Sequence, residues 1–162
     1  MSRRIPLEER LWTRVEKTPT CWNWTGYVGP KGYGEISLGG RHGLMRRTHR
    51  VAYELANGPI PEGLEVDHSC RNRACVNPAH LRLVTRKQNM ENKGQEGASN
   101  NRSSGVRGVY RASTNRWFGR VAHNHQTYHV GTFKTIEEAK AAVVAKRLEL
   151  FTHNDADRRQ AA

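Results

Sequence analysis

The sequence predicts an α+β fold made of two small domains that are joined by a polar linker. Three observations predict it. Cys70, Cys75 and His80 follow one another at short, even spacing in the first part of the chain. Residues 94–104 contain no bulky apolar side chain and cannot build a core. Beyond them, three alternating segments precede one helical segment. The expected division is 1–93, a linker at 94–104, 105–152, and a tail at 153–162.

The first domain is predicted to begin with a helix and a hairpin. Leu7, Leu11 and Val15 repeat at helical spacing, which predicts a helix over residues 7–16. The alternation of residues 21–24 predicts a strand that pairs, through a Gly-rich turn, with residues 33–38.

A second helix and a strand, loop, strand and helix follow. Residues 48–57 are predicted to be helical, with Thr48 as the cap and with Val51, Ala52 and Leu55 buried. Residues 64–68 and 81–84 are predicted strands. Thr85 and Gln88 have the spacing of a capping box at the start of a further helix.

Four side chains of the first domain suit a tetrahedral zinc ion. Cys70, Cys75 and His80 lie in one short polar loop, and Cys21 would come from the predicted hairpin. Three thiolates and an imidazole are typical ligands of structural Zn²⁺, and a closed site of this kind leaves no position for water. The alternative is three unrelated buried cysteines and a core histidine.

A second metal is predicted next to this loop. The loop would place Asp67 and His68 opposite Asn89 in the first turns of the next helix. Oxygen ligands from Asp67 and Asn89 suit Mg²⁺ or Mn²⁺ better than a sulfur-rich set does.

The charge balance predicts a polyanionic partner. Lys and Arg number 27 against 15 Asp and Glu, which gives a formal net charge of +12. The alternative is a solvated basic surface without a specific ligand. An apolar signal segment is missing, three cysteines cannot all pair, and no apolar run reaches the ~18 residues of a membrane helix. We therefore expect an intracellular protein with reduced thiols and no membrane partner.

The residues from Cys21 to Lys93 resemble the HNH branch of the ββα-metal (His-Me finger) nucleases, and their spacing is also similar to that of the His-Cys-box homing endonucleases. The resemblance implies that His68 is the general base and that Asp67 and Asn89 hold one catalytic divalent ion. It implies that Asn77 shapes the loop. The last position of the motif is Asn89 rather than His.

The second domain is predicted to contain strands at 106–111, 116–123 and 127–133, followed by a helix with a Thr135 and Glu138 capping box. Its pieces, among them Gly108-Val109-Tyr110-Arg111 and Val130-Gly131-Thr132-Phe133, resemble the AP2 DNA-binding domain over residues 104–151. The resemblance implies a sheet laid into the major groove. The residues expected on its contact face are Arg107, Arg111, Arg116, Arg120 and His129. Tyr110 and Ala122 depart from the family pattern, so the base sequence that is read does not carry over.

Together these features predict a site-specific, homing-type DNA endonuclease that hydrolyses phosphodiester bonds of double-stranded DNA, as a monomer or a homodimer, in a bacterial or phage-infected cell. Two alternatives stay open: a catalytically inactive zinc-containing DNA-binding protein, and a phage packaging or repair nuclease. Arg50 and His49 are weaker phosphate-contact candidates, with helix packing or capping as their alternative role. One of Arg41, Arg46, Arg47 and Arg50 is expected to clamp the cleaved strand.

Overall fold

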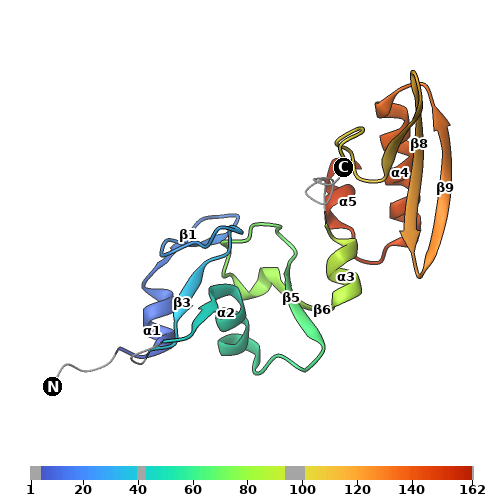
Figure 1. The fold of residues 1–162 in the computed structure, drawn as a ribbon. Helices are drawn as coiled ribbons and strands as arrows, with labels where there is room; N and C mark the ends of the chain where they lie inside the picture. Colours follow the sequence, from blue (N-terminus) through green and yellow to red (C-terminus); the bar gives the residue numbers. More distant parts are fainter. Residues whose placement is uncertain (1–4, 40–42, 94–100, 162) are drawn as a thin grey trace. The chain divides into compact units, whose positions relative to one another are not determined.

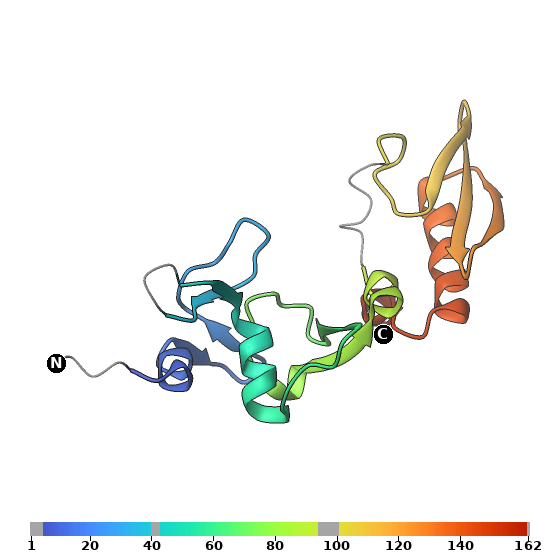
Figure 2. The ribbon, with the colours of Figure 1, turned by 60° about the horizontal axis from the view of Figure 1, so that its bottom comes forward.

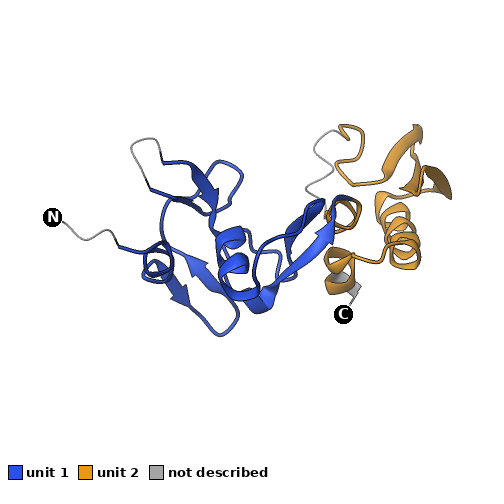
Figure 3. Ribbon diagram, turned by 90° about the horizontal axis from the view of Figure 1, so that it is seen from below, with its two compact units in different colours: residues 1–86 blue, residues 87–162 orange. Residues whose placement is uncertain are grey.

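The computed structural model describes residues 5–39, 43–93 and 101–161. The chain divides into two compact units, residues 1–86 and residues 87–162 (Figure 3). This division falls before the expected linker at 94–104, most of which lies outside the described residues, and the domain assignment stays a prediction. Over the described ranges, the structure contains no helix with the length and apolar character needed to cross a membrane.

The first unit combines short helices with strands that pair two by two. The antiparallel pairs are β1 with β2, β3 with β4, and β5 with β6, and the last pair lies side by side in Figure 2. The elements are α1 (Leu7–Trp12), β1 (Val15–Lys17), β2 (Trp22–Trp24), β3 (Glu35–Ser37), β4 (Met45–Arg47), α2 (Thr48–Asn57), β5 (Leu64–His68), the 3₁₀ helix η1 (Pro78–His80) and β6 (Leu81–Thr85).

Two expectations for the start of the chain are wrong. The first helix ends at Trp12, because Val15 belongs to β1 and pairs with Trp24. The strand at residues 22–24 pairs with β1, whereas β3 pairs with β4. The Gly-rich turn does form, with a bridge between Val28 and Gly34, but pairing stops there. The ring of Trp24 lies against Gly34, where a Cβ atom would come within 2.6 Å of it, so only a glycine fits at this position.

The second helix has the predicted bounds, Thr48–Asn57, and ends at Gly58, which has a φ of 86°. Its cap and its buried face differ from the prediction. Arg47 occupies the cap position, and Thr48 is fully buried. Leu55 is 42% exposed, while Val51 and Ala52 are buried as predicted.

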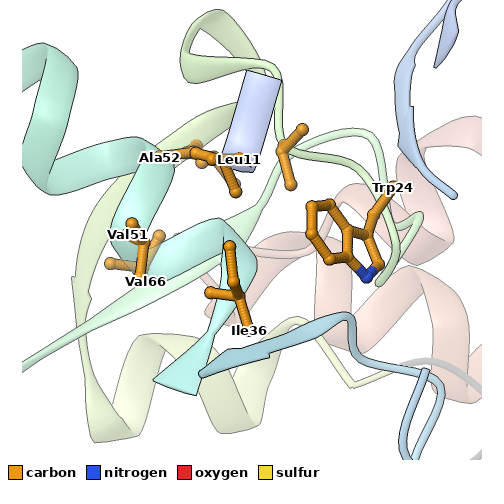
Figure 4. Packing of buried hydrophobic residues seen from close by; sticks show 8 residues of the cluster. Leu11, Trp24, Ile36, Val51, Ala52 and Val66 are labelled. Atoms are coloured by element: carbon orange, nitrogen blue, oxygen red, sulfur yellow. The ribbon is translucent and has the colours of Figure 1, made fainter. Parts of the chain in front are cut away.

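The core of the first unit joins buried residues from α1, β2, β3, α2, β5 and β6. Leu11, Trp24, Ile36, Val51 and Val66 converge in Figure 4. Each fully buried aliphatic side chain contributes about 1.5 to 3 kcal/mol relative to exposure. This core lies under the loop between β5 and η1 and fixes one side of it through Val76, which is fully buried.

The second unit has the predicted three-stranded antiparallel sheet, in the order β7-β8-β9, and α4 packs against it (Figure 1). The Thr135 and Glu138 capping box of α4 is present. Val109, Val121, Ala139, Val143 and Phe151 form its core. The elements are α3 (Arg86–Glu91), whose first residue belongs to the first unit, β7 (Val109–Ser113), β8 (Arg116–His123), β9 (Gln126–Phe133), α4 (Ile136–Leu150) and α5 (Asp155–Ala161).

The expected tail contains α5, which is held to α4 by a buried ion pair. The Nε atom of Arg147 lies 2.7 Å from Oδ2 of Asp157, and both side chains are less than 5% exposed. Burying a charge pair costs desolvation free energy, which is offset only when the two groups keep a close, well-aligned contact. The pair therefore fixes where α5 packs on α4.

Candidate functional site

Three cysteines and a histidine of the first unit form one cluster. The ligand atoms of Cys21, Cys70, Cys75 and His80 all lie within 4.8 Å of one another. The Nδ1 atom of His80 is 3.6 Å from the sulfur of Cys75 and 3.9 Å from that of Cys21. Ligands around a tetrahedral zinc ion at Zn–S of about 2.3 Å lie roughly 3.5 to 3.8 Å apart. The cluster is therefore compatible with zinc.

Backbone pairing brings the distant Cys21 to the loop. Asn23 forms an isolated bridge with Cys75, and the N–H groups of Trp24 and Val76 donate to Ala74 and Trp22 at 2.9 and 2.8 Å. The strand β2 therefore pairs with the cysteine loop rather than with the strand of the predicted hairpin.

Asn77 shapes the same loop, as the resemblance implied. Its side-chain oxygen accepts from the N–H of Ala79 at 3.1 Å and caps η1, which starts at Pro78. This turn presents His80 to the three cysteines.

The thiols of the cluster influence one another. All three cysteines are free of disulfides. A hydrogen bond with Cys75 raises the pKa of the Cys70 thiol, and the same bond lowers the pKa of Cys75 to about 4. The site thus favours a thiolate even before a cation is bound, which suits a metal that binds sulfur as thiolate.

His68 ends β5 and is 5% exposed. Its Nε2 lies 3.0 Å from the carbonyl oxygen of Cys75. A carbonyl oxygen only accepts, so the Nε2 atom carries the hydrogen and donates, and Nδ1 keeps its lone pair. Burial is the main cause that lowers the pKa of His68 below its ordinary value of 6.5. The side chain is therefore a neutral base at neutral pH, held in one tautomer by the cysteine loop.

His49 and Tyr33 pack around His68. The ring centroid of His49 is 4.7 Å from that of His68, and the ring of Tyr33 lies 5.2 and 6.1 Å from the two histidines. Burial lowers the pKa of His49 to about 2, and the side chain is only 2% exposed. These contacts favour the packing role for His49. Tyr33 was not a sequence candidate, because it stands in a glycine-rich turn without any motif.

Asp67 precedes His68 on β5, and its carboxylate contacts the neighbouring strand. Oδ2 of Asp67 accepts from Nη2 and Nε of Arg82, its partner on β6, at 3.0 and 3.2 Å. A cation at Asp67 would therefore share the carboxylate with a guanidinium.

The arginines proposed as a clamp differ in their surroundings. Arg46 pairs with Glu54 at 2.7 Å, and Arg50 is half-buried on α2. The guanidinium carbon of Arg47 lies 4.5 Å from the ring centroid of Tyr33, and that of Arg73 lies 5.6 Å from it. Arg41 lies outside the described residues. Arg47 and Arg73 are thus linked, through Tyr33, to the ring of His68.

Asn89 lies on α3 and belongs to the second unit. The first unit by itself contains His68, Asp67 and the cysteine cluster. That Asn89 lies with His68 and Asp67 around one metal centre remains a prediction from the sequence.

The sheet of the second unit presents one face to α4 and an opposite, basic face. Arg120 lies on the opposite face, with its guanidinium carbon 4.3 Å from the ring centroid of Tyr110, and it pairs across the sheet with His129. Arg116 shares this face by strand alternation. Arg120, His129 and Arg116 are all exposed.

The other two expected contact residues lie differently. Arg111 is opposite Trp117, a residue that packs against the core, and its guanidinium carbon lies 5.9 Å from that ring. The guanidinium of Arg107 donates to the carbonyl oxygens of Met90, at 3.2 Å, and of Lys93. The donors of Arg107 are therefore used inside the unit.

Comparisons with known proteins assign part of the chain to a family. Residues 46–91 match the family model of the HNH endonucleases. An uncharacterized HNH endonuclease of Acanthamoeba polyphaga mimivirus is 30% identical over 139 residues, which cover 85% of this chain and 68% of that protein. No solved structure matches the chain.

Two proteins of Escherichia phage T7 are also similar. Protein 7.7 is 44% identical over 71 residues, 44% of this chain and 52% of its own length. Protein 2.8 is 39% identical over 95 residues, 56% of this chain and 64% of its own length. The chain therefore spans less than two thirds of either phage protein.

Proposed function

This chain belongs to the HNH endonuclease family, and we propose that it hydrolyses phosphodiester bonds of double-stranded DNA with one divalent cation, Mg²⁺ or Mn²⁺. His68 is the general base. The observation that carries this role is the hydrogen bond between His68 Nε2 and the Cys75 carbonyl oxygen, 3.0 Å long. It leaves Nδ1 as the basic atom and prevents the ring from turning over.

Different residues of the chain have different roles in the proposed hydrolysis. His68 takes a proton from the attacking water at Nδ1, and its lowered pKa keeps that atom unprotonated near neutrality. A cation held by Asp67 and Asn89 would stabilise the negative charge of the scissile phosphate and of the leaving 3′ oxygen. Arg47, which lies over Tyr33, is the arginine best placed to bind the phosphate on the His68 side.

Zinc in the cysteine cluster has a structural role in this proposal. Four protein ligands close the coordination sphere, so the ion activates no water. Cys75 supplies one ligand through its sulfur and holds His68 through its carbonyl group. The zinc would therefore fix the catalytic tautomer through a single residue.

The second unit anchors the enzyme on its target in a homing-type, site-specific mode. The net charge of +12 supports a DNA partner. Arg116, Arg120 and His129 form the contact face, with Arg111 at its border. Arg50 adds a phosphate contact on the first unit. The similarity to T7 proteins supports action inside a phage-infected bacterium.

Cleavage of supercoiled plasmid tests the proposal. A plasmid library carrying random inserts is incubated with the full chain, with Mg²⁺ or with chelator, and the variant His68→Ala is compared with His125→Ala, an exposed histidine in the turn between β8 and β9. We expect Mg²⁺-dependent nicking or linearisation by the wild type and by His125→Ala. His68→Ala binds DNA and zinc but cleaves at least about 100-fold more slowly.

The outcomes separate the alternatives. Binding without cleavage of any library member would establish the inactive DNA-binding protein instead. Cleavage without sequence preference would favour a packaging or repair nuclease, with the second unit as a general tether.

A further inference from the structure

The last residue of α3 is a buried glutamate whose partners are far away in the sequence. Glu91 is 4% exposed. Its Oε2 accepts from the N–H of Thr152 at 3.1 Å, from the Thr152 hydroxyl at 3.2 Å and from the N–H of His153 at 3.4 Å. A carboxylate is buried at a tolerable cost only when such donors surround it. Glu91 therefore fixes the end of α3 to the segment between α4 and α5.

The other oxygen of the same carboxylate faces basic side chains. Oε1 of Glu91 lies 3.3 Å from Nε2 of His123, at the end of β8, and 3.6 Å from Nζ of Lys87 on the preceding turn of α3. The side chain of His123 is 13% exposed. The carboxylate thus joins α3 to the sheet as well.

Two further residues hold the same helix end. The N–H of Asp155 donates to Oδ1 of Asn92 at 3.0 Å, and Asn92 is 6% exposed. Arg107 donates to the carbonyl oxygen of Met90, which is among those that a helix C-terminus leaves without intrahelical partners, and to that of Lys93, just beyond the helix. Segments before β7, at the end of β8 and after α4 all converge on α3.

These contacts matter because α3 cannot be stable by itself. It has six residues, and isolated helices shorter than ~12 to 15 residues are marginal in water. Asn89 precedes Glu91 by two residues, about 3 Å along the helix axis. Whatever fixes Glu91 therefore also fixes the backbone that carries Asn89.

We propose that Glu91 is a positioning residue that fastens α3, and with it the proposed cation ligand Asn89, to the DNA-anchoring second unit. The inference rests on the proposed function for the role of Asn89. It makes the second unit a part of the catalytic apparatus rather than a tether beyond a linker. The sheet that binds DNA and the side-chain amide of Asn89 then belong to one folded unit.

The test compares the full-length wild type with Glu91→Gln, which keeps the shape of the side chain and removes its charge. Glu149→Gln is the matched control, since Glu149 is a 63% exposed side chain with Lys146 as its ion-pair partner. Amide hydrogen exchange of residues 86–92 is measured without DNA or Mg²⁺. The Mg²⁺ concentration for half-maximal cleavage, the DNA Kd and the zinc content are measured in parallel.

We expect the α3 amides of Glu91→Gln to exchange at least about ten-fold faster, with the β7 to β9 amides unchanged. The half-maximal Mg²⁺ concentration rises about five-fold or more, because a loosened ligand binds its cation less well, while the DNA Kd stays within about two-fold. Glu149→Gln behaves as the wild type in every measurement.

Unchanged α3 exchange and an unchanged Mg²⁺ requirement in Glu91→Gln overturn the inference while leaving cleavage intact. Faster α3 exchange in a protein whose wild type cuts no DNA overturns the proposed function and supports the anchoring of α3. If Glu91→Gln also loses protection in the sheet, Thr152→Val replaces it. That variant removes one hydroxyl donor from an exposed residue, and a smaller increase in α3 exchange is expected.

Discussion

The two units of this chain hold themselves together in different ways. In the first, paired strands of three to five residues are joined by loops, and a cluster of three cysteines and a histidine links two of those loops. In the second, β8 and β9 have eight residues each and α4 has 15, and they enclose a continuous apolar core. The first unit has short strands and irregular loops, and its cysteine cluster is compatible with a zinc ion that would hold two of these loops together. The second is stabilised by burial and offers a regular basic face.

Removing the metal should produce the largest difference between the units. Chelation, or Cys75→Ser, should unfold the first unit, because structural zinc contributes roughly 10 kcal/mol or more of apparent binding free energy in small zinc domains. The second unit should keep its own melting transition and serves as the internal control. Calorimetry with a zinc assay measures both. Two unchanged transitions after complete chelation would contradict the role given to the cluster.

A cavity in the other core should have the converse effect. Val143 is 1% exposed and packs against Gly108 and Gly119. Val143→Ala should lower the free energy of unfolding of the second unit by about 2 kcal/mol and leave the zinc content and the first transition unchanged. Calorimetry, which follows the transitions of the two units separately, reports it. Equal destabilisation of both units would show that they fold as one.

A change on the basic face should affect binding without affecting stability. Arg120→Gln should weaken DNA binding by about 1 to 3 kcal/mol and reduce the slope of log K against log salt by about one. Arg102→Gln, at another exposed position, is the matched control. Fluorescence anisotropy at several salt concentrations measures both. Equal losses in the two variants would point to general charge rather than to this face.

The pH dependence should show the smallest effect. Because burial lowers the pKa of His68 below 6.5, the base stays unprotonated as the pH falls through 6.5. Protonation begins only at the lower folded pKa, so the single-turnover cleavage rate should stay level through pH 6.5 and decline at more acidic values. A decline centred above pH 6.5 would assign the base to another group.

Local signals predicted the elements whose ends depend on their own residues. The bounds of α2 followed from Gly58 and Pro59, and the alternation of residues 64–68 gave β5. The capping box of α4 was visible in Thr135 and Glu138. The spacing of Cys70, Cys75 and His80 was sufficient to predict that these three residues form a cluster, because they lie close together in the sequence. Cys21, which is distant in the sequence, was predicted only as the fourth ligand that a tetrahedral site needs.

Tertiary contacts decided the rest. The partner of β2 depends on where the Trp24 ring packs, which alternation alone does not show. No sequence motif indicates that Tyr33 lies beside the histidines or that Arg82 donates to Asp67. The resemblance to the AP2 domain placed Arg107 among the DNA contacts, and its hydrogen bonds to the end of α3 carry no signal in the sequence. The helix α5 depends on the buried pair of Arg147 and Asp157.

The most direct test of the central claim is the tautomer of His68, read from long-range ¹H–¹⁵N correlation spectra of the zinc-loaded protein near pH 7. We expect a neutral ring that is protonated at Nε2, with the Nδ1 resonance of an unprotonated nitrogen. Removal of zinc should abolish this preference. A ring protonated at Nδ1 in the zinc-loaded protein would contradict the account, because the cysteine loop would then not hold His68 as the base.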